Sequence, residues 1–263
     1  YQERYLPRKL KIGIAIPPNN EVDVLINDIA LIAIIENGQL KGFNIAAGGG
    51  LSATHGNAAT YARLATVLGF VDTEEKVMKT IYEIVTVQRD YGNRSDRKLA
   101  RLKYTIDNLG VEKYKEEVEK RTGFKLEPAR PYTFNERKDF YGWYKGQNGL
   151  WYYTLFVENG RVLDDEKLAI KTALLEIAKT DKCNFHFTSS QNIIITDVAE
   201  ADKAVIDKLL QEFRLIEHTD NASLIRKNAI ACVALPTCPL ALAEAQRYLP
   251  GLLDKVEPLL VKH

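Results

Sequence analysis

The chain has little of what secreted, membrane-spanning and nucleic-acid-binding proteins use. It holds three cysteines in 263 residues, an odd and small number that does not form a secreted disulfide framework. It has no run of about 18 apolar residues, so no transmembrane helix is expected. Its formal net charge is only +1, which argues against a globally basic nucleic-acid binder. We therefore expect a cytoplasmic protein with reduced thiols, no membrane contact and no bound nucleic acid.

The first residues lack the features of a targeting signal. The segment that begins at Tyr1 has neither an initiating methionine nor the apolar stretch of a signal peptide, and we expect it to be an excised start. Hydrophobic residues make up 46% of the chain, which is enough to build the core of one large domain or two ordinary ones.

The order of the predicted elements favours an α+β fold with mixed sheets and flanking helices. The tripeptide Glu-Asn-Gly occurs at residues 36–38 and 158–160, and each copy predicts a hairpin because Asn-Gly supports a type I′ turn. The recurrence hints at a diverged internal repeat. Strands are predicted at residues 9–16, 29–35, 40–46, 150–157, 161–163, 184–188 and 192–196. Helices are predicted from residue 73, where Thr73 is a candidate N-cap, and at residues 95–109 and 111–121, which Gly110 and Gly123 are expected to end. Further helices are predicted at residues 167–179, 200–213 and 240–248.

Lys9 and Lys11 flank Leu10 in the first predicted strand. Side chains alternate along a strand, so both lysines are expected on one face. Two ammonium groups on one face repel each other unless an anion or water lies between them. The pattern therefore indicates either an anion site or a solvated edge strand, where lysine is common.

Three glycines, Gly48, Gly49 and Gly50, follow a predicted strand and precede the segment Thr54-His-Gly-Asn57. Consecutive glycines let the backbone approach a ligand closely and can aim N–H groups at an anion. The spacing matches neither a Walker A loop nor a dinucleotide fingerprint. A flexible connector explains the glycines equally well.

A densely basic segment follows at residues 88–104. Arg94, Arg97 and Arg101 have the spacing of one helix face, which can bind phosphate or carboxylate groups. RNA binding and a plain solvated face are the alternatives. Only Tyr91 and Tyr104 offer base-stacking rings here, which weakens the RNA interpretation.

Two cysteines near the end of the chain, Cys232 and Cys238, lie in one proline-containing segment. They form half of a possible metal site or are buried thiols that behave as small hydrophobes. An iron–sulfur cubane takes four thiolates. Cys183 lies in a predicted strand and is expected to pack, and the histidines His55, His186 and His218 show no metal-binding spacing.

Taken together, these segments resemble the nitrite/sulfite reductase family that carries siroheme coupled to a [4Fe–4S] cluster, and in particular the assimilatory sulfite reductase hemoprotein (β) subunits. The resemblance runs along the whole chain. The segments that match the family are residues 5–11, 42–44, 48–51, 54–57, 88–94, 130–132, 155–161, 175–178, 191–192 and 231–245.

The resemblance implies a pseudo-twofold α+β fold. Residues 1–130 would form a siroheme-side lobe, 131–215 a ferredoxin-like half-module, and 216–263 the start of the cluster lobe. It also implies the six-electron reduction of sulfite to sulfide, with an electron-donating flavoprotein or ferredoxin as partner. Siroheme nitrite reductase is the alternative within the family.

Roles for individual residues follow from the resemblance alone. Lys9 and Lys11 would bind sulfite and deliver protons to it. Cys232 and Cys238 would be the first two cluster ligands. The siroheme contacts would come from Arg8, Gly49, Gly50, Thr54, His55, Asn57, Gln191 and Asn192.

The chain departs from the family pattern in three ways. A second cysteine pair is absent, so is the half that supplies further active-site arginines, and His186 stands where arginine is expected. We therefore expect an interior fragment that by itself holds neither siroheme nor cluster well and is inactive.

Overall fold

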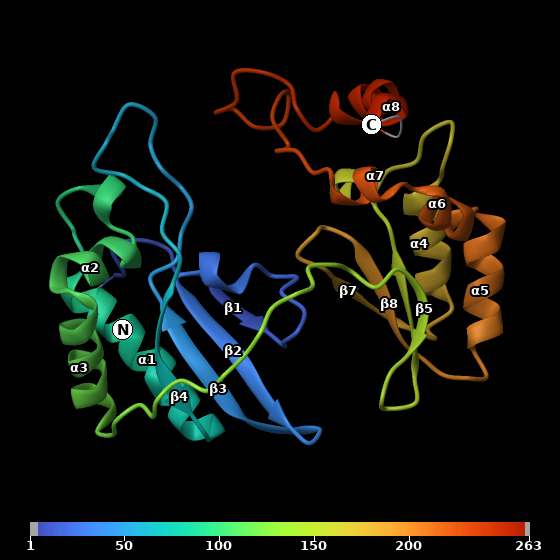
Figure 1. Cartoon of the computed structure of the whole chain (residues 1–263). Coiled ribbons are helices and arrows are strands. Elements are labelled where there is room, and N and C mark those ends of the chain that lie inside the picture. Colours follow the sequence, from blue (N-terminus) through green and yellow to red (C-terminus); the bar gives the residue numbers. More distant parts are fainter. Residues whose placement is uncertain (1–4, 261–263) are drawn as a thin grey trace. The chain divides into compact units, whose positions relative to one another are not determined.

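The structure is a computed structural model that describes residues 5–260. The first residues, which we expected to be an excised start, lie outside this range. The chain forms two compact units, Tyr1–Lys138 and Asp139–His263, and each has its own four-stranded sheet (Figure 1). Among the described residues, no helix combines the length and the apolar composition that a bilayer crossing needs.

The sheet of the first unit has the order β1-β2-β3-β4, with β1 parallel to β2 and the other pairs antiparallel. The first six residues of β2 are all buried, as expected of a strand covered on both faces. The predicted turn between β2 and β3 is confirmed: Asn37 and Gly38 have φ of 53° and 73°. The strands are β1 (Ile12–Ala15), β2 (Ile29–Glu36), β3 (Gln39–Ala47) and β4 (Thr66–Val71).

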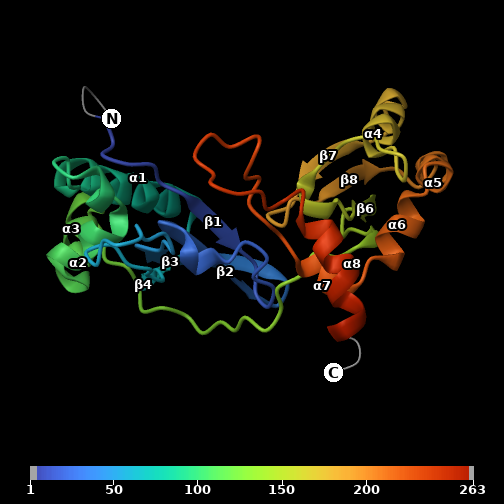
Figure 2. The same cartoon turned by 90° about the horizontal axis from the view of Figure 1, so that it is seen from above.

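Three helices pack against one face of this sheet: α1 (Glu74–Tyr91), α2 (Leu102–Leu109) and α3 (Val111–Thr122). Figures 1 and 2 show them gathered beside the strands. The predicted caps are confirmed. The side chain of Thr73 accepts a hydrogen bond from Lys76 N at the start of α1, and Gly110 and Gly123 end α2 and α3.

The second unit contains an antiparallel sheet of order β5-β6-β8-β7, covered on one face by helices that share its core (Figure 2). Its strands are β5 (Gly142–Lys145), β6 (Trp151–Leu155), β7 (Asn184–Phe187) and β8 (Ile193–Val198). Its core helices are α4 (Ile170–Lys179), α5 (Lys203–Glu212) and α6 (Leu215–Asn221). Helices α7 (Leu224–Asn228) and α8 (Leu249–Leu260) follow. The predicted mixed α+β class is confirmed.

Two expectations are wrong in this unit. Glu158–Gly160 is a short 3-10 turn and not a hairpin, because Asn159 is buried and its Oδ1 accepts a hydrogen bond from Ala231 N at 3.1 Å. The repeated tripeptide therefore marks no repeated hairpin. The last helix, predicted at 240–248, begins instead at Leu249. Pro250 is tolerated in its first turn, because a first-turn N–H has no partner within the helix.

Candidate functional site

A cationic pocket of about 470 Å³ lies in the first unit. Six of its lining side chains are cations, and among residues 5–260 no carboxylate lines it. Arg101 is the one cation of the six that forms an ion pair within the same range of residues, and its partner is Asp28. The lining residues are Arg8, Lys9, Lys11, Ser52, Ala53, Thr54, Thr60, Arg97, Lys98, Arg101 and Tyr104.

Lys9 and Lys11 reach this pocket from the segment just before β1. Both are exposed, while Leu10 between them packs against the core formed with the helices. The alternation that places the two lysines on one side is therefore confirmed, although the strand begins at Ile12 and not at Lys9. Lys11 is fixed on both sides, because its N–H donates to Asp28 Oδ2 at 2.8 Å and its carbonyl accepts from Ile29 N at 3.0 Å.

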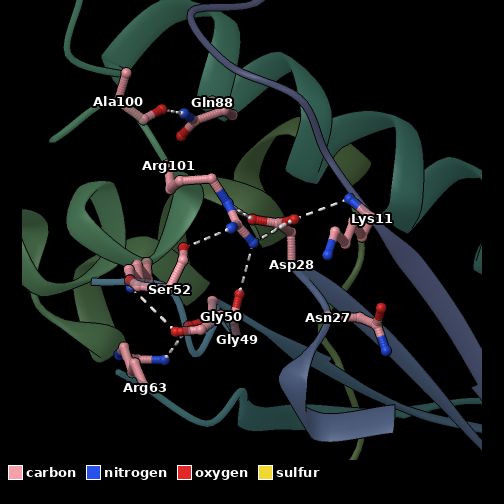
Figure 3. Close-up of polar contacts among 12 residues, drawn as sticks. Lys11, Asn27, Asp28, Gly49, Gly50, Ser52, Arg63, Gln88, Ala100 and Arg101 are labelled. Carbon is pink, nitrogen blue, oxygen red and sulfur yellow. Dashed lines mark hydrogen bonds and ion pairs between the residues drawn. The ribbon is translucent and has the colours of Figure 1, made fainter. Parts of the chain in front are cut away.

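Asp28 and Arg101 form a buried bidentate ion pair beside the pocket, which Arg101 lines (Figure 3). Arg101 Nε and Nη2 donate to the two carboxylate oxygens of Asp28, each at 2.9 Å. The side chain of Arg101 is 9% exposed and that of Asp28 is 0% exposed. The guanidinium also donates to Gly49 O at 3.3 Å and to Ser52 Oγ at 3.4 Å. Arg101, which stands just before α2, thus contacts the residue before β2, the glycine segment and Ser52.

The three glycines use their N–H groups inside the protein. The N–H groups of Gly48, Gly49 and Gly50 donate to backbone carbonyls of Asp28, Asn27 and Arg63 at 2.8–3.0 Å. The expectation that they point at an anion is therefore not met. Glycine is needed here because neighbouring atoms leave no room for a side chain. A Cβ on Gly49 would lie 2.3 Å from a backbone carbonyl oxygen, and one on Gly50 would lie 2.9 Å from the Arg101 guanidinium. The roles of Gly49 and Gly50 as cofactor contacts stay predictions.

The loop that follows brings only part of the predicted set to the pocket. Thr54 lines it, and its N–H donates to Thr60 Oγ1 at 2.7 Å. His55 is exposed, and Asn57 Oδ1 accepts from Ala59 N at 3.1 Å. Neither His55 nor Asn57 is among the lining residues in the described part of the chain.

Arg94, Arg97 and Arg101 do not lie on one helix face, contrary to the prediction. A 3-10 turn, Arg97–Leu99, and the separate helix α2 replace the single helix expected at residues 95–109. Asp96 caps that turn, and Arg101 stands before α2 because Asp28 binds its side chain. Arg94 donates to backbone carbonyls of Tyr5 and Arg89.

The sequence argument missed three pocket residues, Arg97, Lys98 and Arg101, as neighbours of Lys9 and Lys11. The sequence showed many basic residues in this segment, but the prediction of a single helix placed them wrongly. A signal was present in Asp96, a typical N-cap residue at the second position of the expected helix, because it allows a new turn to begin at Arg97.

In the second unit, Asn192 is buried and fully engaged. Its Oδ1 accepts from Val157 N at 2.9 Å, and its Nδ2 donates to Asp139 Oδ2 at 2.7 Å and to the Tyr141 hydroxyl at 3.1 Å. Gln191 is exposed in a left-handed turn with φ of 66°. Their predicted siroheme contacts stay predictions.

The cysteine segment is an irregular folded loop. Cys232 is exposed and Cys238 is half-buried, and both thiols are free. Arg247 ties the loop together by donating to Leu235 O at 3.1 Å and to Thr237 Oγ1 at 3.0 Å. Cys183 is also free, and burial raises the pKa of its thiol. In the described part of the chain, no group of three or more His, Cys, Asp or Glu side chains forms a metal site.

Comparison with known proteins identifies two domains of one family. Residues 1–126 match the nitrite and sulphite reductase 4Fe-4S domain, and residues 144–213 match the nitrite/sulfite reductase ferredoxin-like half domain. Cys183 lies within the second matched range, whereas Cys232 and Cys238 lie outside both ranges.

Curated relatives match along the whole chain. The sulfite reductase [NADPH] hemoprotein beta-component of Leptospira biflexa is 59% identical over 100% of this chain and 47% of its own length. The protein of the same name from Geobacillus thermodenitrificans is 54% identical over 99% and 45%. The chain thus spans about half the length of these relatives.

A solved structure, that of the Mycobacterium tuberculosis NirA protein, is similar with a TM-score of 0.77 and 27% sequence identity, over 97% of this chain and 45% of that one. The two domain matches, the whole-chain identities and this likeness agree with each other: the chain belongs to the nitrite and sulfite reductase family.

Proposed function

We propose that this chain forms part of the substrate and cofactor site of a siroheme-dependent sulfite reductase, the hemoprotein subunit. The observation that carries the proposal is the pocket lined by six cations and no described carboxylate. Such a pocket stabilises bound anions, and sulfite and the carboxylates of siroheme are both anionic. The names of the curated relatives support sulfite as the substrate.

The residues present fit siroheme. When bound, siroheme supplies an iron that takes sulfite through sulfur and passes on electrons. Arg8, Arg97 and Lys98 supply positive charge for the carboxylates, and arginine can bind a carboxylate through two parallel hydrogen bonds. The other proposed siroheme contacts in the first unit are Gly49, Gly50, Thr54, His55 and Asn57. The resemblance alone supports Gln191 and Asn192 as siroheme contacts.

Lys9 and Lys11 are the proposed catalytic residues. Conversion of sulfite to sulfide consumes six electrons and six protons and releases the three oxygens as water. Two ammonium groups beside the substrate oxygens stabilise their negative charge and donate hydrogen bonds along which protons move. Asp28 accepts a hydrogen bond from the backbone N–H of Lys11, so the backbone that carries the Lys11 ammonium group is fixed.

Cys232 and Cys238 are the proposed ligands from this chain to a [4Fe–4S] cluster. They fit half of a cluster, because a cubane takes four thiolates and the whole sequence has three cysteines. The 263-residue chain by itself is therefore expected to hold no intact cluster and little siroheme. Strong siroheme absorption with stoichiometric iron in the purified chain would contradict this expectation.

We also propose the three-part division of the chain at about residues 130 and 215 and a cytoplasmic location, which the free thiols support. The electron donor is a flavoprotein or a ferredoxin. Siroheme nitrite reduction is the alternative activity. Turnover of sulfite against nitrite separates the two activities, and turnover with each donor separates the donors.

The test uses the full-length reductase that contains this chain. Lys9→Met and Lys11→Met, each alone, are expected to leave siroheme absorption in place and to lower sulfite turnover at least about a hundredfold, the usual size of a lost proton donor. Lys113→Met, which changes an exposed lysine of α3, is the matched control and keeps full activity. Unchanged turnover in both pocket variants would refute the assignment.

A further inference from the structure

A fully buried lysine, Lys103, lies directly behind the cationic pocket. It belongs to α2, has an exposed fraction of 0%, and is not among the described lining residues of the pocket. Lysine is almost never fully buried unless its ammonium group is paired. Among residues 5–260, Lys103 forms no ion pair with a carboxylate. Its burial therefore needs another explanation.

Three backbone carbonyls supply that explanation. Lys103 Nζ donates to Gly50 O at 3.0 Å, to Ser52 O at 2.8 Å and to Tyr61 O. An ammonium group has three hydrogens, so all of its donors are used. The charge also lies 5.0 Å from the ring centre of Tyr104 and 5.6 Å from that of Tyr61. Burial, together with the nearby charge of Arg101, lowers the pKa of Lys103, which leaves these contacts to hold the cation.

The three carbonyls stand at the two ends of one loop. Gly50 and Ser52 begin it and Tyr61 ends it, so the ammonium group of Lys103 joins the two ends like a clasp. It does so beside a backbone pair in which Gly50 N donates to Arg63 O at 2.8 Å and Arg63 N donates to Gly50 O at 3.0 Å. Residues 51–56 are all exposed and offer little apolar surface to anchor the loop. Its internal hydrogen bonds centre on Thr60, whose Oγ1 accepts from Thr54 N at 2.7 Å and whose N–H donates to Asn57 O at 3.0 Å.

This loop is one wall of the cationic pocket, to which it contributes Ser52, Ala53, Thr54 and Thr60. The opposite wall carries the lysines before β1 and the basic residues before α2. If the loop moves away, the cations remain but the pocket loses its shape.

We infer that Lys103 is a positioning residue: its ammonium group closes the loop at residues 50–61 and so keeps the wall of the anion pocket in place. The importance of the pocket rests on the proposed function, whereas the closing of the loop rests on the hydrogen bonds alone.

Two measurements on the 263-residue chain test this inference. Hydrogen–deuterium exchange follows the amides of residues 51–61. Calorimetric titration at low salt follows binding of benzenehexacarboxylate, a planar polycarboxylate that serves as the probe. Lys103→Met is expected to speed exchange in the loop at least about tenfold and to weaken probe binding by a similar factor, as the loss of charged hydrogen bonds predicts.

Two matched lysine variants separate position from charge. Lys98→Met removes a pocket cation, so it weakens probe binding but leaves loop exchange unchanged. Lys113→Met, at an exposed position of α3, changes neither. Faster exchange in β2 would reveal that Lys103→Met unfolds the unit. In that case Lys103→Gln is used in its place, because the glutamine amide still donates hydrogen bonds but carries no charge. Faster loop exchange and weaker probe binding are expected for this variant too.

Unchanged loop exchange in Lys103→Met or Lys103→Gln overturns the inference, and so does faster exchange with unchanged probe affinity. Failure of the unmutated chain to bind the probe contradicts the proposed function instead, and loop exchange then still decides whether Lys103 closes the loop.

Discussion

Replacing Asp28 by asparagine removes one charge and changes one oxygen to NH2 without changing the shape of the side chain. Three donors meet the Asp28 carboxylate: Arg101 Nε, Arg101 Nη2 and Lys11 N, all at 2.8–2.9 Å. An amide offers one acceptor oxygen to them, so at least one buried N–H faces another N–H. The charge of Arg101 also loses its partner. Breaking a buried ion pair in this way costs about 3–5 kcal/mol.

The chain contains a matched control for this change. Asp107 also receives two donors, the Tyr61 hydroxyl at 2.7 Å and Arg63 Nε at 2.9 Å, but its side chain is 35% exposed, against 0% for Asp28. Water compensates an exposed pair, so Asp107→Asn is expected to cost about 1 kcal/mol or less.

Urea unfolding of the 263-residue chain, followed by circular dichroism, gives both free energies of unfolding. Asp28→Asn is expected to lower the stability of the first unit by at least about 2 kcal/mol more than Asp107→Asn does, from the two ranges above. A difference of less than about 0.5 kcal/mol between the free energies of unfolding of the two variants is within the usual scatter of mutational effects. Such a result would mean that the buried Asp28–Arg101 pair does not stabilise the pocket.

Two further predictions concern packing and pH. Gly49→Ala is expected to destabilise the first unit by about 3 kcal/mol, because its Cβ would meet the carbonyl oxygens of Leu25 and Asn27 at 2.3 and 2.4 Å. Gly251→Ala is the control and should have little effect on stability, because the space around Gly251 is open. Equal unfolding midpoints for the two variants would refute this reason. Burial lowers the pKa of His218, which stacks on Phe156. The unfolded chain then binds more protons than the folded chain below about pH 6.5, so the stability of the second unit falls as the pH falls through that window. His218→Phe is expected to flatten the pH dependence measured by urea unfolding, and an unaltered slope would contradict the cause.

Local sequence signals predicted the elements that are governed by local chemistry. The Asn37-Gly38 turn, the Thr73 cap and the glycine stops after α2 and α3 all depend on backbone conformation or on a neighbour three residues away. The Lys-Leu-Lys alternation also survived, because Leu10 needs the core whether or not its neighbours have formed a strand.

The errors have distant partners as their cause. Arg101 leaves the predicted helix because Asp28, 73 residues away, binds its guanidinium. Asn159 forms no hairpin because Ala231, 72 residues away, donates to it. The clasp of Lys103 involves carbonyls, which carry no side-chain signal at all. Such contacts become visible only when the chain is folded.

The central claim is that the pocket around Lys9 and Lys11 binds anions through its positive charge. The most direct measurement is the affinity of the 263-residue chain for benzenehexacarboxylate at several salt concentrations, with and without Lys9→Met and Lys11→Met. We predict that binding weakens as salt rises, because ions screen exposed charges, and that each substitution weakens binding several-fold at low salt, while Lys113→Met leaves it unchanged. Binding that is independent of salt and of both pocket lysines would contradict the claim.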